Sequence, residues 1–284
     1  MLRIAVPNKG RLSEEVLGLF TDAGLPISLH GARALTAVVG DEFELLFLRA
    51  QDIPVFVADG AADAGVTGWD LVRESARELR TVVDLELGRC RLVVAGREDG
   101  VTDLSALPDG AAVATAFPRL AAQFFEQLGK RVRVVPMCGA VEVAPRLGVA
   151  EVIVDLVSTG STLKSNGLRE LAGVLESTAR LVTRAEVGGD QARGIEDLAS
   201  ALSSVVRARS RRYLMANAPK EKLAEIREVL PGINGPTVVD VMDGGRFVAV
   251  HAVVATSSVY RTINSLRRLG CEGILLTRIE RLVP

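Results

Sequence analysis

The sequence predicts an α/β protein whose mainly parallel sheets are covered by helices and are followed by a C-terminal βαββαβ module. Over the first two thirds of the chain, short apolar runs rich in β-branched residues alternate with amphipathic runs, which is typical of parallel sheets flanked by helices. The last third has the element order of a ferredoxin-like module. The chain has 284 residues, of which 48% are hydrophobic, and this length suffices for two or three compact units.

The first two thirds of the chain begin with a strand over residues 2–6. A helix over residues 12–23 follows, because apolar side chains recur at helical spacing and Gly24 comes directly after them. The other strands expected here cover residues 43–48, 64–66, 92–95, 112–116, 132–135 and 152–157. The other helices cover residues 53–58 and 69–77, and one begins near Pro118, since proline is favoured in a first helical turn.

The last third is expected to form strands over residues 212–217, 237–242, 247–254 and 274–279, and helices over residues 220–230 and from 256 or 257 to 269. The segment Asp243-Gly244-Gly245 joins the two central strands and is typical of a hairpin turn. We place the start of this module near residues 206–212, where a run of arginines indicates an exposed connection.

The charge and cysteine content exclude several classes of protein. The 34 basic and 35 acidic residues give a net charge of −1, so no nucleic-acid partner is expected. Three widely spaced cysteines and two histidines fit reduced thiols in a cytoplasmic protein rather than disulfides or a zinc site. The chain begins with a strand-like run and has no apolar stretch long enough to cross a bilayer, so we expect neither secretion nor a membrane span.

The strongest candidate site is the turn after the strand over residues 152–157. It supplies hydroxyl groups, a glycine and the start of a helix, and its residues are Ser158, Thr159, Gly160, Ser161 and Thr162. Hydroxyls and outward backbone N–H groups form a cradle suited to phosphate, and Asp155 at the strand end can accept hydrogen bonds from sugar hydroxyls. A capped helix start without any ligand explains the turn equally well.

Three further strand ends carry polar residues. Lys9 and Arg11 stand beside a predicted helix start, where the helix dipole disfavours cations unless an anion lies between them. Arg49 ends the strand over residues 43–48, and Asp70 follows Thr67-Gly68-Trp69. Each also has a purely structural interpretation: solvated basic side chains, or a helix cap at Asp70. Cys90 and Cys138 are expected to be inert thiols. Ligands of open α/β folds bind at the carboxyl ends of strands, which favours one shared site.

Together these segments resemble the ATP phosphoribosyltransferase family, which catalyses the first step of histidine biosynthesis. The similarity rests on the signature from Glu142 to Leu163, on Pro7-Asn8-Lys9-Gly10-Arg11-Leu12 and on Gly65-Val66-Thr67-Gly68-Trp69-Asp70-Leu71, and it extends over essentially the whole chain. The C-terminal module makes the chain similar to the long form of the family, since the short form lacks this module and depends on a synthetase-like partner.

The resemblance implies two lobes similar to periplasmic binding proteins, with the active site in the cleft. Lobe I would comprise residues 1–90 with 186–208, lobe II residues 91–185, and the regulatory domain residues 211–284. The chain would cross between the lobes near residues 89–91 and 184–188.

The implied reaction joins N1 of ATP to C1 of 5-phosphoribosyl 1-pyrophosphate and releases pyrophosphate, with Mg²⁺ on the phosphates. Residues 158–162 would hold the 5′-phosphate and Asp155 the ribose hydroxyls, while Glu142 would lie near the reacting sugar. Lys9 and Arg11 would face the pyrophosphate or ATP phosphates. The implied ATP site includes Arg49, Asp70 and Cys90.

The resemblance also implies a dimer or hexamer that binds L-histidine as an effector at its regulatory domain. The expected effector residues are Asn217, Gly235, Thr237 and Gly273. Some relatives have an acidic residue near position 217, whereas Asn217 carries no charge, so a purely structural module is the competing interpretation. Two alternatives to the whole assignment are a two-lobed ligand sensor and a different phosphoribosyltransferase, because a fold does not fix a function.

Overall fold

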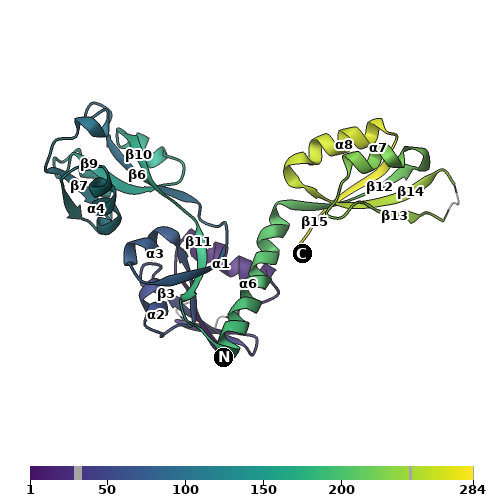
Figure 1. Cartoon of the computed structure of the whole chain (residues 1–284), viewed down its shortest axis with the longest axis horizontal. Coiled ribbons are helices and arrows are strands. Elements are labelled where there is room, and N and C mark those ends of the chain that lie inside the picture. Colours follow the sequence, from purple (N-terminus) through teal and green to yellow (C-terminus); the bar gives the residue numbers. More distant parts are fainter. Residues whose placement is uncertain (29–33, 243–244, 284) are drawn as a thin grey trace. The chain divides into compact units, whose positions relative to one another are not determined.

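The computed structural model describes residues 1–28, 34–242 and 245–283. By its contacts the chain divides into two compact units, one of Met1–Gly18 with Pro26–Ala199 and one of Leu19–Leu25 with Ser200–Pro284. The first unit holds two sheets and the second holds one (Figure 1). Among the described residues, no helix combines the length and the apolar character that a membrane crossing requires.

The first sheet has the strand order β2-β3-β1-β4-β11-β5. Its strands are β1 Leu2–Pro7, β2 Thr36–Val39, β3 Phe43–Leu48, β4 Ala64–Gly68, β5 Leu79–Asp84 and β11 Ala179–Arg184. The helices connected to it are α1 Arg11–Asp22, α2 Ile53–Ala58, α3 Trp69–Ser75 and α6 Gly189–Arg209. β1 is parallel to both β3 and β4, so their polar carboxyl-terminal turns lie at the same edge of the sheet.

The second sheet has the order β10-β6-β9-β7-β8. Its elements are β6 Cys90–Arg97, β7 Ala111–Thr115, α4 Pro118–Gln127, β8 Val132–Pro136, β9 Val152–Val157, α5 Ser161–Ser165 and β10 Leu168–Ser177, with 3-10 turns at Leu104–Ala106 and Val141–Val143. Alternate residues of β9 point to opposite faces. Val152 and Val154 join a core with α4, whereas Ile153 joins a second core with Leu163 of α5.

The C-terminal sheet is antiparallel, with the order β13-β14-β12-β15. Its strands are β12 Arg211–Pro219, β13 Thr237–Asp240, β14 Phe247–Ala255 and β15 Glu272–Arg278, its helices are α7 Leu223–Val229 and α8 Val259–Arg268, and 3-10 turns lie at Lys220–Lys222 and Thr256–Ser258. Both helices cover one face (Figure 1), where they pack on residues such as Leu214 and Val250. The predicted βαββαβ module is confirmed. In its predicted hairpin turn, Asp243 and Gly244 lie outside the described residues.

The structure corrects one domain boundary. β10 ends at Ser177 in the second sheet, and β11 pairs antiparallel with β4 and β5 of the first sheet from Ala179 onward. The chain therefore returns to the first sheet at residue 178, and the assignment of residues 179–184 to lobe II, with a crossing near residues 184–188, is wrong. The pairing joins segments about a hundred residues apart, and no local pattern marks such a register.

Candidate active site

The turn after β9 has the composition and the backbone that the sequence analysis expected. Gly160 has φ +80° and directly precedes α5, which is a conformation that glycine adopts without strain. The hydroxyls of Thr159 and Ser161 lie 3.0 Å apart. All four hydroxyl-bearing residues, Ser158, Thr159, Ser161 and Thr162, are exposed.

A small cavity of about 190 Å³ opens beside this turn. It is lined by Glu142, Asp155, Leu156, Val157, Ser158, Thr159, Gly160, Thr162 and Leu163. The structure thus brings Glu142, from a turn upstream of β9, to the same cavity as the predicted phosphate cradle. Ser161 does not line it, although its hydroxyl contacts that of Thr159.

The ionisation of Asp155 on this cavity depends on burial and on its neighbours. Burial raises the pKa of Asp155, the nearby charge of Glu142 raises it further, and the backbone N–H of Leu156, which donates to Oδ1 at 2.8 Å, opposes both effects. Glu142 follows Ala140, a non-glycine residue with φ +51°. Left-handed backbone at such a residue is a strained arrangement that occurs often near functional sites.

The turn after β1 is less dependent on an anion than its sequence suggested. Lys9 and Arg11 are both exposed, but Arg11 Nε donates to Glu15 Oε1 at 2.5 Å. The other oxygen of Glu15 accepts the backbone N–H of Gly88 at 3.2 Å. A carboxylate of the chain itself therefore offsets one of the two cations near the start of α1.

The residues expected at the ATP site lie on other strand ends. Arg49 is exposed directly after β3, and the Thr67 hydroxyl donates to the neighbouring Ala50 carbonyl at 2.8 Å. Neither Arg49 nor Lys9, Arg11, Asp70 or Cys90 lines the cavity beside Asp155. Their placement at a shared active site therefore stays a prediction.

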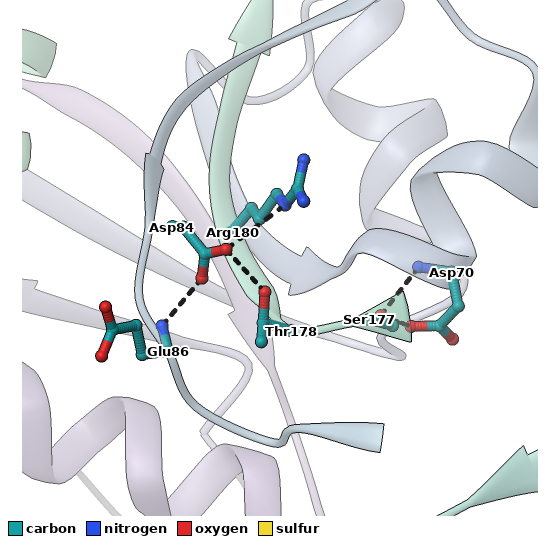
Figure 2. A network of polar contacts seen from close by, with 6 residues as sticks. All are labelled: Asp70, Asp84, Glu86, Ser177, Thr178 and Arg180. Atoms are coloured by element: carbon teal, nitrogen blue, oxygen red, sulfur yellow. Dashed lines mark hydrogen bonds and ion pairs between the residues drawn. The ribbon is translucent and has the colours of Figure 1, made fainter. Parts of the chain in front are cut away.

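Asp70 is buried and does not act as an ordinary helix cap, since Gly68 is the N-cap residue of α3 and makes no side-chain cap bond. Its carboxylate accepts the Ser177 hydroxyl instead (Figure 2). Burial raises the pKa of Asp70. Burial, and then the charge of Asp70, raise the pKa of the Cys90 thiol to about 11. Cys90 is therefore a neutral thiol at physiological pH, in agreement with the inert interpretation.

A second polar cluster surrounds the point where the chain returns to the first sheet (Figure 2). Asp84 accepts hydrogen bonds from the Thr178 hydroxyl at 2.8 Å and the Glu86 N–H at 2.9 Å, and its Oδ2 lies 3.9 Å from Arg180 Nε. The Arg180 guanidinium also lies 4.0 Å from the centroid of the Trp69 ring. The sequence does not point to Asp84, Ser177, Thr178 or Arg180, because their partners are distant in the sequence and no motif connects them.

The expected effector residues come together only in part. Asn217 is exposed on β12, opposite Glu272 of β15. Gly273 has φ +56°, and a Cβ there would lie 3.3 Å from Asn217 Nδ2, so this side chain packs closely over Gly273. Thr237 lies on β13, which is separated from β12 by β14. Gly235, with φ +99°, lies in the turn before β13.

A larger cavity, of about 620 Å³, lies in the second unit and contains none of the predicted site residues. Four arginines line it, namely Arg209, Arg212, Arg278 and Arg281, and some of them already have partners. Arg209 Nη2 lies 3.7 Å from an oxygen of Asp22, and Arg281 donates to the Ser204 hydroxyl and to the Ala23 carbonyl. The cavity is therefore a less convincing site than the turn after β9.

Comparison with known proteins connects both units to one family. A sequence model described as ATP phosphoribosyltransferase matches residues 49–204, and one described as HisG, C-terminal domain, matches residues 208–281. The chain is 62% identical over 293 residues to an ATP phosphoribosyltransferase of Gemmatimonas aurantiaca, and 45% identical over 284 residues to one of Natronomonas pharaonis. Each comparison covers 100% of both chains.

A solved structure extends the similarity to three dimensions. It is a chain of the ATP phosphoribosyl transferase (HisG:HisZ) complex from Thermotoga maritima, with a TM-score of 0.64 and 28% identity. The match covers 73% of this chain and 99% of that chain. This chain therefore carries a substantial segment that the Thermotoga chain lacks.

Proposed function

The chain belongs to the ATP phosphoribosyltransferase family, in its long form, and on this premise we propose that residues 155–162 bind the phosphoribosyl group of its substrate. The enzyme joins N1 of the ATP adenine to C1 of 5-phosphoribosyl 1-pyrophosphate and releases pyrophosphate, which is the first step of L-histidine biosynthesis. Full-length similarity to named transferases favours this function over a ligand sensor.

One observation carries the proposed binding site: a single cavity holds the hydroxyl-rich turn together with Glu142 and Asp155. In this proposal, the hydroxyls of Ser158, Thr159 and Thr162 donate to the 5′-phosphate, and Gly160 allows close backbone approach. Asp155 accepts from the ribose hydroxyls, since an ionised carboxylate is an acceptor only. In this proposal Ser161 does not bind the phosphate. Its hydroxyl hydrogen-bonds the hydroxyl of Thr159 and so stabilises the turn.

The chemistry needs positioning more than a base, because N1 of adenine already carries a lone pair. The barrier lies in separating pyrophosphate from a sugar that develops positive charge, so electrostatic stabilisation contributes most. Glu142 and Asp155 supply negative charge beside the sugar. Lys9 and Arg11 supply positive charge for the pyrophosphate or the ATP phosphates. In this proposal Arg49 binds a phosphate of ATP, and Asp70 lies near its adenine.

We propose Mg²⁺ as a partner of the substrate phosphates at this site. Among the described residues, no group of three or more His, Cys, Asp or Glu side chains is arranged to hold a metal. Mg²⁺ commonly binds through substrate phosphates and one or two carboxylates, and Glu142 and Asp155 are the carboxylates available at the cavity. When bound, Mg²⁺ would neutralise charge on the leaving pyrophosphate.

Steady-state kinetics on Thr162→Ala test the phosphate cradle. Loss of one hydrogen bond to a charged group lowers kcat/KM for 5-phosphoribosyl 1-pyrophosphate by about tenfold or more. The matched control is Ser165→Ala, which removes a hydroxyl at the other end of the same helix, outside the cavity, and leaves the constant unchanged. Near-normal efficiency of Thr162→Ala would contradict the assignment.

Regulation and assembly complete the proposal. L-histidine is the proposed effector, and the proposed effector residues are Asn217 and Gly273, which pack together, and Gly235 and Thr237, which lie before and on β13. A homo-oligomer, dimer or hexamer, in the cytoplasm is proposed on the family resemblance. Exposed apolar side chains on two edge strands of the C-terminal sheet, Val238, Val239 and Leu275, support an interface there.

A further inference from the structure

Arginines gather around the cavity of about 620 Å³ in the second unit. It lies where the end of α6 continues into β12 (Figure 1), next to the end of β15 and the end of α1. Four arginines and two carboxylates make up its charged lining, namely Arg209, Arg212, Arg278, Arg281, Asp22 and Glu280. Their formal charges, four positive and two negative, leave an excess of two positive charges around the cavity.

Two of these arginines stand opposite each other on neighbouring strands. Arg212 of β12 and Arg278 of β15 are directly paired in the antiparallel ladder, an arrangement in which like charges destabilise a sheet. Arg212 Nη1 donates to the backbone carbonyls of Arg209 and Arg211 at 3.2 and 2.6 Å, which are neutral partners. Within the described part of the chain, the Arg278 side chain has no hydrogen-bond or ion-pair partner. The chain therefore supplies no carboxylate that offsets the charge of this pair.

The other two arginines are oriented by neighbouring groups. Arg281 donates from Nε to the hydroxyl of Ser204 at 2.9 Å and from Nη1 to the carbonyl of Ala23 at 3.0 Å. Arg209 Nη2 lies 3.7 Å from an oxygen of Asp22. A guanidinium has more N–H donors than these contacts use, and it has no acceptor. The cavity therefore offers oriented donors to an anion, which lowers the entropy lost when a ligand binds.

We propose that this cavity is a second anion site, which binds a small phosphorylated molecule with its phosphate group between Arg212 and Arg278. A phosphate group carries close to two negative charges near neutral pH, which matches the excess of positive charge, whereas a single carboxylate offsets only half of it. Phosphate oxygens also accept paired N–H groups from guanidinium forks.

The size of the cavity fits a ligand larger than a phosphate ion. Its volume of about 620 Å³ is typical of small-molecule sites, and Val205 and Ile279 supply apolar lining for the rest of the molecule. The cavity shares no lining residue with the proposed cradle at residues 155–162. The two sites can therefore be tested independently.

Titration calorimetry with inorganic phosphate tests the site on the full chain, at neutral pH and constant ionic strength. Every protein in the series carries Thr162→Ala, which weakens the separate phosphate cradle after β9. We expect Arg278→Gln, and likewise Arg212→Gln, to weaken phosphate binding by about tenfold or more, because hydrogen bonds between charged groups are lost. The matched control is Arg227→Gln, which removes an exposed guanidinium of α7 outside the cavity and leaves the affinity unchanged.

Urea denaturation of the same variants separates ligand binding from folding. Without phosphate, Arg278→Gln is expected to be at least as stable as Arg227→Gln, because one of two opposed charges is removed. Added phosphate then stabilises Arg227→Gln more than Arg278→Gln, since only a folded chain with an intact site binds it.

Three results would overturn the proposal. They are equal phosphate affinity of Arg278→Gln and Arg227→Gln, malonate binding as tightly as phosphate, and a loss of stability in Arg278→Gln without phosphate, which would give Arg278 a structural role. None of them bears on the transferase reaction, whose failure would instead appear as the absence of an ATP-dependent product from the wild-type enzyme.

Discussion

At the scale of single residues, Asp155 is a carboxylate whose folded environment opposes its charge. Burial first, and the charge of Glu142 next, raise its pKa above the ordinary value. The folded state therefore binds the proton more tightly than the unfolded state. The contribution of Asp155 to stability is greatest below the unfolded pKa, and it declines as the pH rises through the raised folded pKa.

Asp155→Asn removes this unfavourable charge and keeps an oxygen that can accept the Leu156 N–H. We expect the melting temperature at pH 7.5 to rise by roughly 2 °C, and kcat/KM for 5-phosphoribosyl 1-pyrophosphate to fall. The gain disappears near pH 3, where Asp155 is protonated in both states. Calorimetry at the two pH values provides the check, and a lower melting temperature at pH 7.5 would contradict the argument.

Residues of the site differ in how far the sequence predicts them. The hydroxyls of the turn after β9, with Asp155 and Glu142, belong to one continuous segment, and their composition alone indicates an anion cradle. Ser177 is an ordinary serine at a strand end, and its hydrogen bond with Asp70, 107 residues away, leaves no trace in the local sequence. Such a contact depends on strand register, which a local pattern does not contain.

At the scale of elements, α4 depends on a carboxylate from another helix. Its N-cap residue, Phe117, makes no side-chain cap bond. The two oxygens of Glu74, on α3, accept the N–H groups of Arg119 and Leu120 at 2.9 Å each. Glu74 therefore performs the task of an N-cap side chain and also complements the helix dipole.

Glu74→Ala leaves these N–H groups without their acceptor. We expect a loss of about 1 kcal/mol in the free energy of unfolding, the usual cost of removing a cap, measured by urea denaturation. Glu78→Ala, which removes an exposed carboxylate from the segment after α3, is the matched control and stays within about 0.5 kcal/mol of wild type. Equal stability of the two variants would show that Glu74 does not cap α4.

Most strands with a continuous apolar run were predicted, whereas four strands of the first unit were not. β1, β3, β4, β6, β7, β8 and β9 overlap the predicted apolar runs. β2, β5, β10 and β11 were missed, because partly exposed strands such as Leu168–Ser177 mix charged and apolar residues. Because β11 was missed, the return of the chain to the first sheet was expected too late in the sequence.

At the scale of the whole molecule, the C-terminal module has its own core, formed by residues between Leu214 and Cys271. The sequence predicted its topology because β14 alternates between buried and partly exposed residues and because α7 and α8 each have an apolar face. The sequence did not predict whether the module binds an effector, because Asn217 is uncharged where some relatives have an acidic residue.

Isothermal titration calorimetry with L-histidine tests the regulatory proposal. Wild type is expected to bind with a measurable heat, and Asn217→Ala more weakly, by about threefold to tenfold for a single neutral hydrogen bond. Thr277→Ala, exposed on β15, is the control and binds as wild type does. The absence of heat at millimolar histidine would reject the sensor role and leave the module structural.

The proposed function stands or falls with the transfer reaction, which a single assay measures. Purified enzyme is mixed with ATP, 5-phosphoribosyl 1-pyrophosphate, Mg²⁺ and pyrophosphatase, and the change in adenine absorbance is followed. We predict a product that requires both substrates and that forms much more slowly with Thr162→Ala than with Ser165→Ala. No ATP-dependent product from the wild-type enzyme, or equal rates for the two variants, would contradict the account.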